Sequence, residues 1–268
     1  MKQSKVDNYQ WQPPKVIKSN SLKLLLLLSI IIYLSLVVFS LDIDWQRIIL
    51  GIKRSRKYFF DFLTPDFITR WSSIISGIIE SLTMTYISTV IGVIISIPVA
   101  LGAAKNISPL PIYYLCRGII ILARSFQEVI IAILFVVMIG LGPLAGILTL
   151  SFTSIGFIAK LLAEEIEGID SSQVEAIKAT GGSWLQVLTY GIIPQIMPRF
   201  IGLSVYRLDI NFRASAIIGV VGAGGIGATL TAAFDRYDFS SASAILILMI
   251  LIVLVGEYFS SQIRKKIQ

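Results

Sequence analysis

The chain has 268 residues, of which 55% are hydrophobic and only 15% charged, with a net charge of +7. Soluble domains carry about 25% charged residues, so this composition indicates a membrane protein. The sequence has no histidine and one cysteine, Cys116, which excludes histidine-based metal sites, Ser-His-Asp triads and an internal disulfide. We expect no catalytic residue and no metal site. The basic residues flank apolar runs rather than forming a stripe, so we also expect no nucleic-acid partner.

Apolar runs organise most of the chain, because a helix needs about 20 such residues to cross roughly 30 Å of hydrocarbon. Residues 1–23 form an expected cytoplasmic tail, and the uncharged run 24–41 predicts the first transmembrane helix. We expect 42–74 to be an external loop, in which clustered basic and aromatic residues predict an interfacial helix. Residues 75–260 are expected to form the transmembrane core, and 261–268 a second cytoplasmic tail.

The next spans are expected near the start of this core. The run 81–104 predicts one of them. The run 129–159 is too long for one crossing and is divided by the turn sequence Gly140-Leu141-Gly142-Pro143. Its first half extends back to about Ile112 as one predicted span. That span carries the charged residues Arg117, Arg124 and Glu128.

Two further spans bring the prediction to about six. One long helix over 196–221 holds charged residues inside the membrane, and the run 239–256 is the last crossing. Six crossings place both ends on one side, and the basic residues of both tails predict that this side is the cytoplasm. The basic residues at 53–57, in the expected external loop, run against this rule. No internal repeat is evident, so the inverted halves of many secondary transporters are not indicated.

The segment 160–199, between the fourth and fifth spans, is the only sizeable polar cytoplasmic loop. Val174–Ala179 predicts a short helix, which Gly181 and Gly182 break. Ser183 is expected to cap a second helical segment, Trp184–Tyr190, that ends before Pro194. Such a shape presents one compact surface to a soluble partner. A plain connecting loop is the alternative.

The residues of this loop favour the docking interpretation. Glu175-Ala176-Ile177, then Gly181, then Gly191-Ile192-Ile193-Pro194 resemble the EAA loop of bacterial ABC importer permeases. The sequence departs from that pattern where Ile177 replaces an alanine, Gly191 an isoleucine and Ile193 a leucine. The resemblance implies that the loop inserts into a cleft on an ATP-hydrolysing subunit and transmits its closure to the membrane. The coupling residues that it implies are Glu175, Ala176, Gly181, Gly182 and Pro194.

A cluster of polar residues lies inside the fifth span, where charged groups are costly unless they are paired or hydrated. Asp209 and Arg213 are four residues apart and are expected to pair, and Arg207 and Asn211 form a second row. One acid against two arginines leaves a positive patch, and a guanidinium fork suits phosphonate oxygens. We therefore predict that Arg207, Asp209, Asn211 and Arg213, with Tyr206, line a substrate path. A salt bridge that locks two helices is the alternative, and both roles can coexist.

A glycine-rich run, Val221–Gly227, follows this span. Gly222, Gly224 and Gly227 match the dinucleotide pattern G-x-G-x-x-G. We reject that reading, because the run follows a membrane span and no acidic residue stands about 20 positions later. With Gly225, these glycines instead predict a tight non-helical turn.

Residues from about 124 to 227 resemble the phosphonate-type ABC importer permeases, through the Gly140–Gly146 string, the EAA loop, Tyr206–Ser215 and Val221–Gly227. The resemblance implies an all-α, polytopic type I ABC importer (MetI-like) permease fold in a bacterial inner membrane. It further implies a homodimer, two ATP-binding cassette subunits and an extracytoplasmic phosphonate-binding protein. The sequence has no phosphate-cradling G-x-x-x-x-G-K-[ST], so we expect this chain to bind no cofactor, with ATP and Mg used by the partner ATPase.

Three alternatives remain open. The first is a related permease for methionine, phosphite or phosphate. The second is an ion-coupled secondary transporter or channel. The third is a membrane enzyme that acts on phospholipids, which the lack of histidine and of any nucleophile constellation disfavours.

Overall fold

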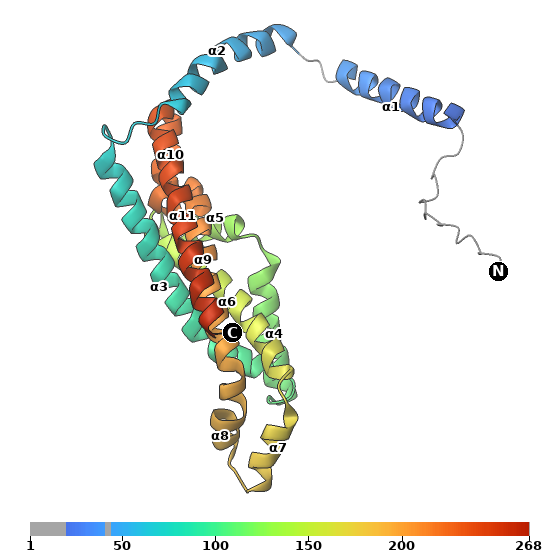
Figure 1. The fold of residues 1–268 in the computed structure, drawn as a ribbon, viewed down its shortest axis with the longest axis vertical. Helices are drawn as coiled ribbons and strands as arrows, with labels where there is room; N and C mark the ends of the chain where they lie inside the picture. The colour runs from blue at the N-terminus through green and yellow to red at the C-terminus, as the bar shows by residue number, and fades with distance from the viewer. Residues whose placement is uncertain (1–19, 41–43, 268) are drawn as a thin grey trace, which may run out of the picture. The chain divides into compact units, whose positions relative to one another are not determined.

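The computed structural model describes residues 20–40 and 44–267, and every described secondary-structure element is helical (Figure 1). The expected tail at 1–23 therefore lies almost wholly outside the described residues. The chain divides into two units, 1–57 and 58–268, which are considered separately.

The first unit contains α1, Asn20–Ser40, and most of α2, Trp45–Leu63. α1 is 21 residues long, has no buried residue and is apolar enough to cross a membrane. α2 contains the basic and aromatic residues of the segment that was expected to be an external loop.

The second unit is the helical core, and it begins with four helices that form its first half. They are α3 (Trp71–Ala103), α4 (Leu110–Ser125), α5 (Glu128–Ile139) and α6 (Pro143–Glu167). α3 and α6 pack along each other. A Cβ at Gly92 of α3 would lie 2.4 Å from Ser154 Cβ of α6. Small residues thus let the two backbones approach closely, as in other membrane helix pairs.

A short helical hairpin and three further helices complete this unit. The hairpin consists of α7 (Ser171–Ala179) and α8 (Trp184–Gln186), followed by a π-helical turn, η1 (Val187–Ile192). α9 (Ile193–Ile218) ends in a second π-helical turn, η2 (Gly219–Ala223). α10 (Gly225–Asp235) and α11 (Phe239–Ile267) follow, and α11 runs beside α9 (Figure 1).

Four described helices are long and apolar enough to span a membrane on their own: α1, α3, α6 and α11. Two bent pairs bring the count to six if each is one crossing. They are α4 with α5, bent by 94°, and the continuous α8–η2 stretch with α10, bent by 56°. This agrees with the expected all-α, polytopic fold of about six spans.

The span expected to begin near Ile112 is not one continuous helix, because it is bent between α4 and α5. The chain leaves helical geometry at Phe126 (φ −108°, ψ 143°) and Gln127 (φ −69°, ψ 145°), and α5 turns away from α4. No proline or glycine causes this break. Tertiary contacts hold α5 in its new direction, because Glu128 at its first turn pairs with Arg207 of α9.

Pro194 was expected to follow the end of a helix, and this prediction is wrong. The helix instead continues through it from Trp184 to Ile218. The π-helical turn η1 lies directly upstream, where the Ile193 N–H bonds to the Leu188 carbonyl, five residues back. Such a widened turn accommodates a ring that lacks an N–H donor, so proline lies in the first turn of α9 without ending the helix.

Candidate substrate path and coupling segment

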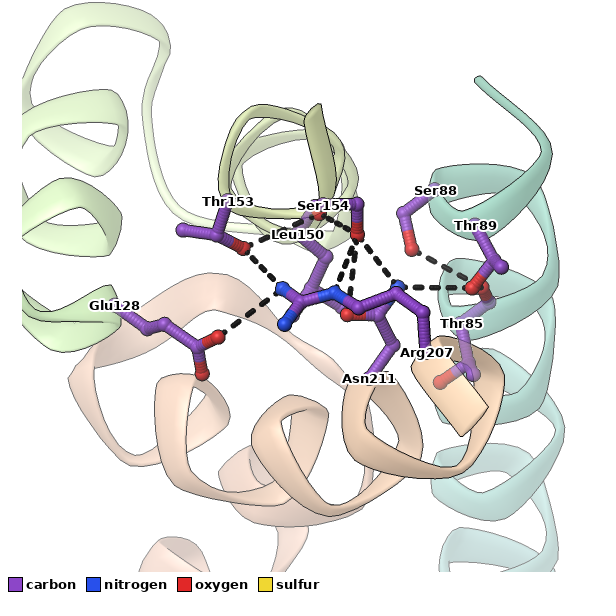
Figure 2. Close-up of polar contacts among 9 residues, drawn as sticks. All are labelled: Thr85, Ser88, Thr89, Glu128, Leu150, Thr153, Ser154, Arg207 and Asn211. Atoms are coloured by element: carbon purple, nitrogen blue, oxygen red, sulfur yellow. Dashed lines mark hydrogen bonds and ion pairs between the residues drawn. The ribbon is translucent and has the colours of Figure 1, made fainter. Parts of the chain in front are cut away.

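A buried polar network joins four helices at the centre of the core (Figure 2). Its centre is Arg207 on α9, whose side chain is only 4% exposed. Arg207 Nη2 lies 3.2 Å from Glu128 Oε1 of α5 and donates to Thr153 Oγ1 of α6 at 2.7 Å. Its Nε donates to Ser154 Oγ at 2.9 Å. The guanidinium therefore has a counter-charge and hydrogen-bond acceptors, as a buried cation requires.

Asn211 extends this network to α3. Its Nδ2 donates to Thr89 Oγ1 at 2.8 Å and to Ser154 Oγ at 2.9 Å. The two hydroxyls in turn donate to carbonyls one turn earlier in their own helices. Figure 2 shows the resulting chain of contacts from Glu128, through Arg207 and Ser154, to Asn211 and Thr89. The polar network (Thr89, Glu128, Thr153, Ser154, Arg207 and Asn211) thus holds α3, α5, α6 and α9 together.

Arg207 was predicted to line a substrate path, and in the structure its side chain lies inside the polar network. Residue 207 is 3% exposed and Asn211 is fully buried. The expected positive patch of one acid against two arginines is wrong, because Glu128 supplies a second carboxylate. From the sequence, Glu128 was expected in a different span from Arg207. The spacing of the two residues in the chain did not indicate that their side chains meet.

The expected pair of Asp209 and Arg213 is confirmed. The Arg213 guanidinium donates to Asp209 Oδ2, while its own side chain is 44% exposed and that of Asp209 is 9% exposed. Arg213 therefore presents a charged group at the surface of the core, and Arg207 does not.

Tyr206 lies apart from these four residues. Its ring is 6.1 Å from the Phe157 ring, and the Arg264 guanidinium carbon of α11 lies 5.4 Å from its centroid. The predicted substrate-path residues are therefore divided among three settings, which are the buried network, the exposed Asp209–Arg213 pair and a pocket beside α11.

The helical hairpin was predicted, and the structure shows how it is held. Asp170 caps α7 by accepting a hydrogen bond from the Ser172 N–H at 2.9 Å, and this bond lowers the pKa of the Asp170 carboxyl. Gly181 adopts φ +79°, as a chain reversal by glycine requires, and Ser183 with Gln186 forms a capping box on α8. Gln195 Oε1 accepts from the Asp170 N–H at 3.0 Å and ties the hairpin to α9.

Two departures from the EAA pattern fit each other in space. A Cβ at Gly191 would lie 3.1 Å from Ile177 Cδ1 and 3.6 Å from the Val174 Cα. The larger isoleucine of α7 therefore packs against the position where glycine replaces isoleucine. α7 lies flush on η1 for this reason, and the hairpin keeps its shape despite both substitutions.

The outer surface of the hairpin is open. Glu175 and Ala176 are exposed, as is the Trp184 side chain. A hollow of about 530 Å³ lies between the hairpin and the ends of neighbouring helices, and Glu167, Glu175 and Trp184 are among its lining residues. An exposed tryptophan beside a charged rim is typical of a protein docking surface.

One ion pair and two hydrogen bonds join the helix ends next to the hairpin. Arg117 Nη2 lies 2.9 Å from Glu167 Oε1, and its Nε donates to the Ala103 carbonyl at 2.9 Å. The Glu167 carboxylate also accepts from the Lys105 N–H at 2.8 Å. The ends of α3, α4 and α6 are thereby joined where the hairpin begins.

The glycine run forms the predicted non-helical turn. Gly222, Gly224 and Gly225 have φ values of +93°, +79° and +73°. The Gly222 carbonyl accepts from the Gly142 N–H at 2.9 Å, so this turn meets the turn that precedes α6. A Cβ at Gly227 would lie 2.0 Å from the Ala216 carbonyl oxygen, so close packing excludes a side chain there.

Sequence reasoning missed the hydroxyl groups that line the core. Ser81, Thr85, Ser88, Thr89 and Ser96 are buried along α3. Their recurrence three, four or seven to eight residues apart within an apolar run was a usable signal of a polar helix face. Among the described residues, no group of three or more His, Cys, Asp or Glu side chains is placed to hold a metal ion.

Comparison with known proteins gives consistent similarities. Residues 92–268 match the family described as binding-protein-dependent transport system inner membrane component. The chain is 38% identical to the phosphate-import permease protein PhnE of Mycolicibacterium smegmatis over 210 residues, 78% of this chain but only 40% of that protein. It is 38% identical to the phosphite transport system permease protein PtxC of Stutzerimonas stutzeri over 204 residues, 76% of this chain and 74% of that protein.

A further relative and a solved structure extend the comparison. The putative cryptic phosphonate transport system permease protein PhnE2 of Escherichia coli is 40% identical over 118 residues, 44% of this chain and 97% of that protein. An inward-facing structure of the MetNI methionine ABC transporter shares the fold, with a TM-score of 0.64 at 24% identity. That match covers 73% of this chain and 96% of the compared chain.

Proposed function

Since the chain belongs to the family of binding-protein-dependent transport system inner membrane components, we propose that it forms the translocation path for phosphonates or closely related phosphorus oxyanions. In this proposal it is the permease subunit of an ATP-driven importer in a bacterial inner membrane, with both termini in the cytoplasm. Two copies form the path, two ATP-binding cassette subunits bind them from the cytoplasm, and an extracytoplasmic binding protein delivers the solute.

The proposed coupling depends on the continuity between the hairpin and α9. The hairpin continues without a break into the helix that bears the intramembrane charges, because α8, η1 and α9 form one helical stretch from Trp184 to Ile218. A partner that displaces Trp184 thus acts on the helical stretch that bears Arg213, and one that displaces Glu175 acts on it through the packing of α7 against η1. Such coupling requires no contact between the ATP site and the solute.

The chemistry of the solute follows from the exposed cation. Arg213 offers planar N–H donors at membrane depth, and Asp209 keeps it oriented in the absence of solute. A phosphorus oxyanion can compete with Asp209 for these donors. Relatives whose names specify phosphate, phosphite and phosphonate transport support a solute of this class.

ATP and Mg enter this proposal only through the partner ATPase. This chain contributes the docking hairpin and the path, and it carries out no covalent chemistry. Permeases for methionine, and ion-coupled transporters, are the competing functions.

Uptake by the reconstituted complex tests the proposal. Proteoliposomes that contain this chain, its ATPase and its binding protein should accumulate labelled methylphosphonate with ATP and not with a non-hydrolysable analogue. An excess of unlabelled phosphonate or phosphite should compete, and methionine should not. Uptake that an uncoupler abolishes while ATP is maintained would instead support ion coupling.

Variants of the two proposed sites should separate coupling from solute contact. Glu175→Arg, on the exposed hairpin, should lower capture of the ATPase at least about tenfold, as removal of one interface anchor does. Arg236→Glu, a charge reversal in the turn between α10 and α11, should retain capture. Arg213→Gln should raise the KM for uptake, and it should also lower thermal stability, because it leaves the Asp209 carboxylate, which is 9% exposed, without its counter-charge. Unchanged uptake kinetics in Arg213→Gln would remove this residue from the path.

A further inference from the structure

A second basic site lies beside the C-terminal end of α11. It is a pocket of about 480 Å³ between α6, α9 and α11. Three cationic side chains line it, those of Arg199, Arg264 and Lys265. Leu161 and Leu203 are also among its lining residues. We propose that this basic pocket binds a phosphate group, and that a membrane phospholipid headgroup is its main source.

The charges of the pocket are only partly neutralised by the protein. Arg199 Nε lies 3.0 Å from Glu165 Oε1, which balances one cation. Arg264 and Lys265 form no ion pair with a carboxylate of the part of the chain that the structure describes. The pocket therefore has two uncompensated positive charges facing a concave surface, which favours an anion.

The geometry of Arg264 suits a phosphate oxygen. Its guanidinium carbon lies 5.4 Å from the centroid of the Tyr206 ring, so the ring holds the guanidinium by a cation–π contact. Among the described residues Arg264 donates no hydrogen bond to the protein, so its N–H groups remain available to a ligand. A planar N–H fork held in one orientation binds phosphate oxygens better than a mobile side chain does.

The position along α11 favours a lipid source. α11 has 29 residues and so measures about 43 Å, longer than the roughly 30 Å hydrocarbon layer. Its last turn, with Arg264, Lys265 and Lys266, therefore extends to the level of the headgroups. Anionic phospholipids concentrate negative charge at that level, and the apolar side chains of Leu161 and Leu203 can contact the start of an acyl chain.

Gly202 provides a way to fill the pocket without changing its charge. It lines the pocket, and a Cβ built on it would meet no atom within 4 Å. A larger side chain at this position enters open space and does not strain α9. Leucine is also a better helix former than glycine, so the substitution should not destabilise the helix.

The test measures lipid bound to the purified full-length chain by native mass spectrometry. Phosphatidylglycerol should be retained in preference to phosphatidylcholine. Arg264→Gln and Lys265→Gln should each weaken its binding about fivefold, the usual effect of removing one cation near an anionic surface. Gly202→Leu should abolish retention.

Lys266→Gln is the matched control, since it removes a charge from the same turn but not from the pocket lining. It should bind phosphatidylglycerol as the unmodified chain does. An equal loss in Lys266→Gln, or retention in Gly202→Leu, would overturn the pocket in favour of diffuse surface attraction.

A second arm distinguishes a lipid from a soluble source. Inorganic phosphate is titrated against the lipid-free protein, and thermal stability is recorded. Stabilisation by phosphate that Arg264→Gln and Gly202→Leu both remove would assign the pocket to soluble phosphate compounds. Failure of both arms would reject the site without affecting the proposed transport function, which depends on the hairpin and on Arg213.

Discussion

Arg207 and Glu128 show how a charge is accommodated inside the helical core. The two side chains are unequally buried, with 4% of the arginine and 32% of the glutamate exposed. Removing one member of such a pair leaves the other without its counter-charge, and the cost depends on how well water can reach the remaining charge. The arginine is therefore the member that depends more on its partner.

This difference in burial predicts different electrostatic costs for the two single substitutions. Glu128→Gln leaves a buried guanidinium uncompensated and should lower the free energy of unfolding by about 1–3 kcal/mol. Arg207→Gln leaves a carboxylate that is 32% exposed and that water can solvate, so the electrostatic part of its cost should be smaller, and it also removes the hydrogen bonds to Thr153 and Ser154. Thermal unfolding of the purified protein measures both effects.

The double variant is the control for this prediction. Glu128→Gln combined with Arg207→Gln removes both charges, so it should cost less than the sum of the single changes. Strict additivity would show that the two residues do not form the interacting pair described here.

At the scale of single elements, glycines determine where two turns meet. The turn at 222–225 and the turn that precedes α6 are joined by the hydrogen bond from the Gly142 N–H to the Gly222 carbonyl. Gly224 (φ +79°, ψ −167°) adopts a conformation that only glycine enters readily, and Gly227 has no room for a Cβ.

Alanine substitutions test this packing. Gly227→Ala and Gly224→Ala should each cost more than about 2 kcal/mol, one through overpacking and the other through backbone strain as well. Gly118→Ala, in α4, is the control, because a Cβ there would meet nothing within 4 Å. Fluorescence-detected size-exclusion chromatography after heating should show early loss of the first two variants only.

The N-terminal cap of α7 gives a second prediction for an element. The Ser172 N–H donates to Asp170, so Asp170→Ala leaves the first turn of α7 uncapped. Hydrogen exchange at pH 7 should then accelerate across the start of α7, while Asp170→Asn should behave as the unmodified chain, because asparagine is also a good cap. Uniform exchange in all three proteins would contradict the cap.

The pH dependence of this cap follows from the same bond. Because the hydrogen bond lowers the pKa of Asp170 below its usual 3.8, the charged form is favoured in the folded state. Its contribution to stability is present above pH 3.8 and is lost as the pH falls through the lower folded-state pKa. The cap is therefore fully formed at neutral pH.

For the whole molecule, the arrangement of helix ends predicts a topology. The hairpin and the end of α11 lie toward one end of the second unit, since Arg199 at the start of α9 and Arg264 line the same pocket. The turn at 236–238 lies at the opposite end of the 29-residue α11. These two ends should face opposite sides of the membrane.

Cysteine labelling checks this topology. Cys116→Ala removes the only cysteine, and single cysteines are then introduced at Thr180, Lys266 and Arg236. In inverted vesicles, an impermeant maleimide should label positions 180 and 266, and in right-side-out vesicles it should label position 236. Labelling of 180 and 236 from the same side would overturn the six-crossing arrangement.

Sequence patterns alone predicted the apolar helices α1, α3, α6 and α11, the hairpin at the EAA loop, the Asp209–Arg213 pair and the glycine turn. These features depend on local physics. Hydrophobic run length, the i, i+4 spacing of a helix and the φ range open to glycine are all expressed within about 20 neighbouring residues.

Which charges are buried and which are open follows only from the packing of the helices. Nothing near Arg207 in the chain indicates that Glu128, 79 residues earlier, is its counter-ion, or that α5 turns by 94° from α4. The same holds for Pro194, whose neighbouring π-helical turn lets the helix continue, and for the pairing of Ile177 with Gly191. The Arg207–Glu128 pair and the direction of α5 depend on contacts between segments distant in sequence, and local propensity carries no record of such contacts.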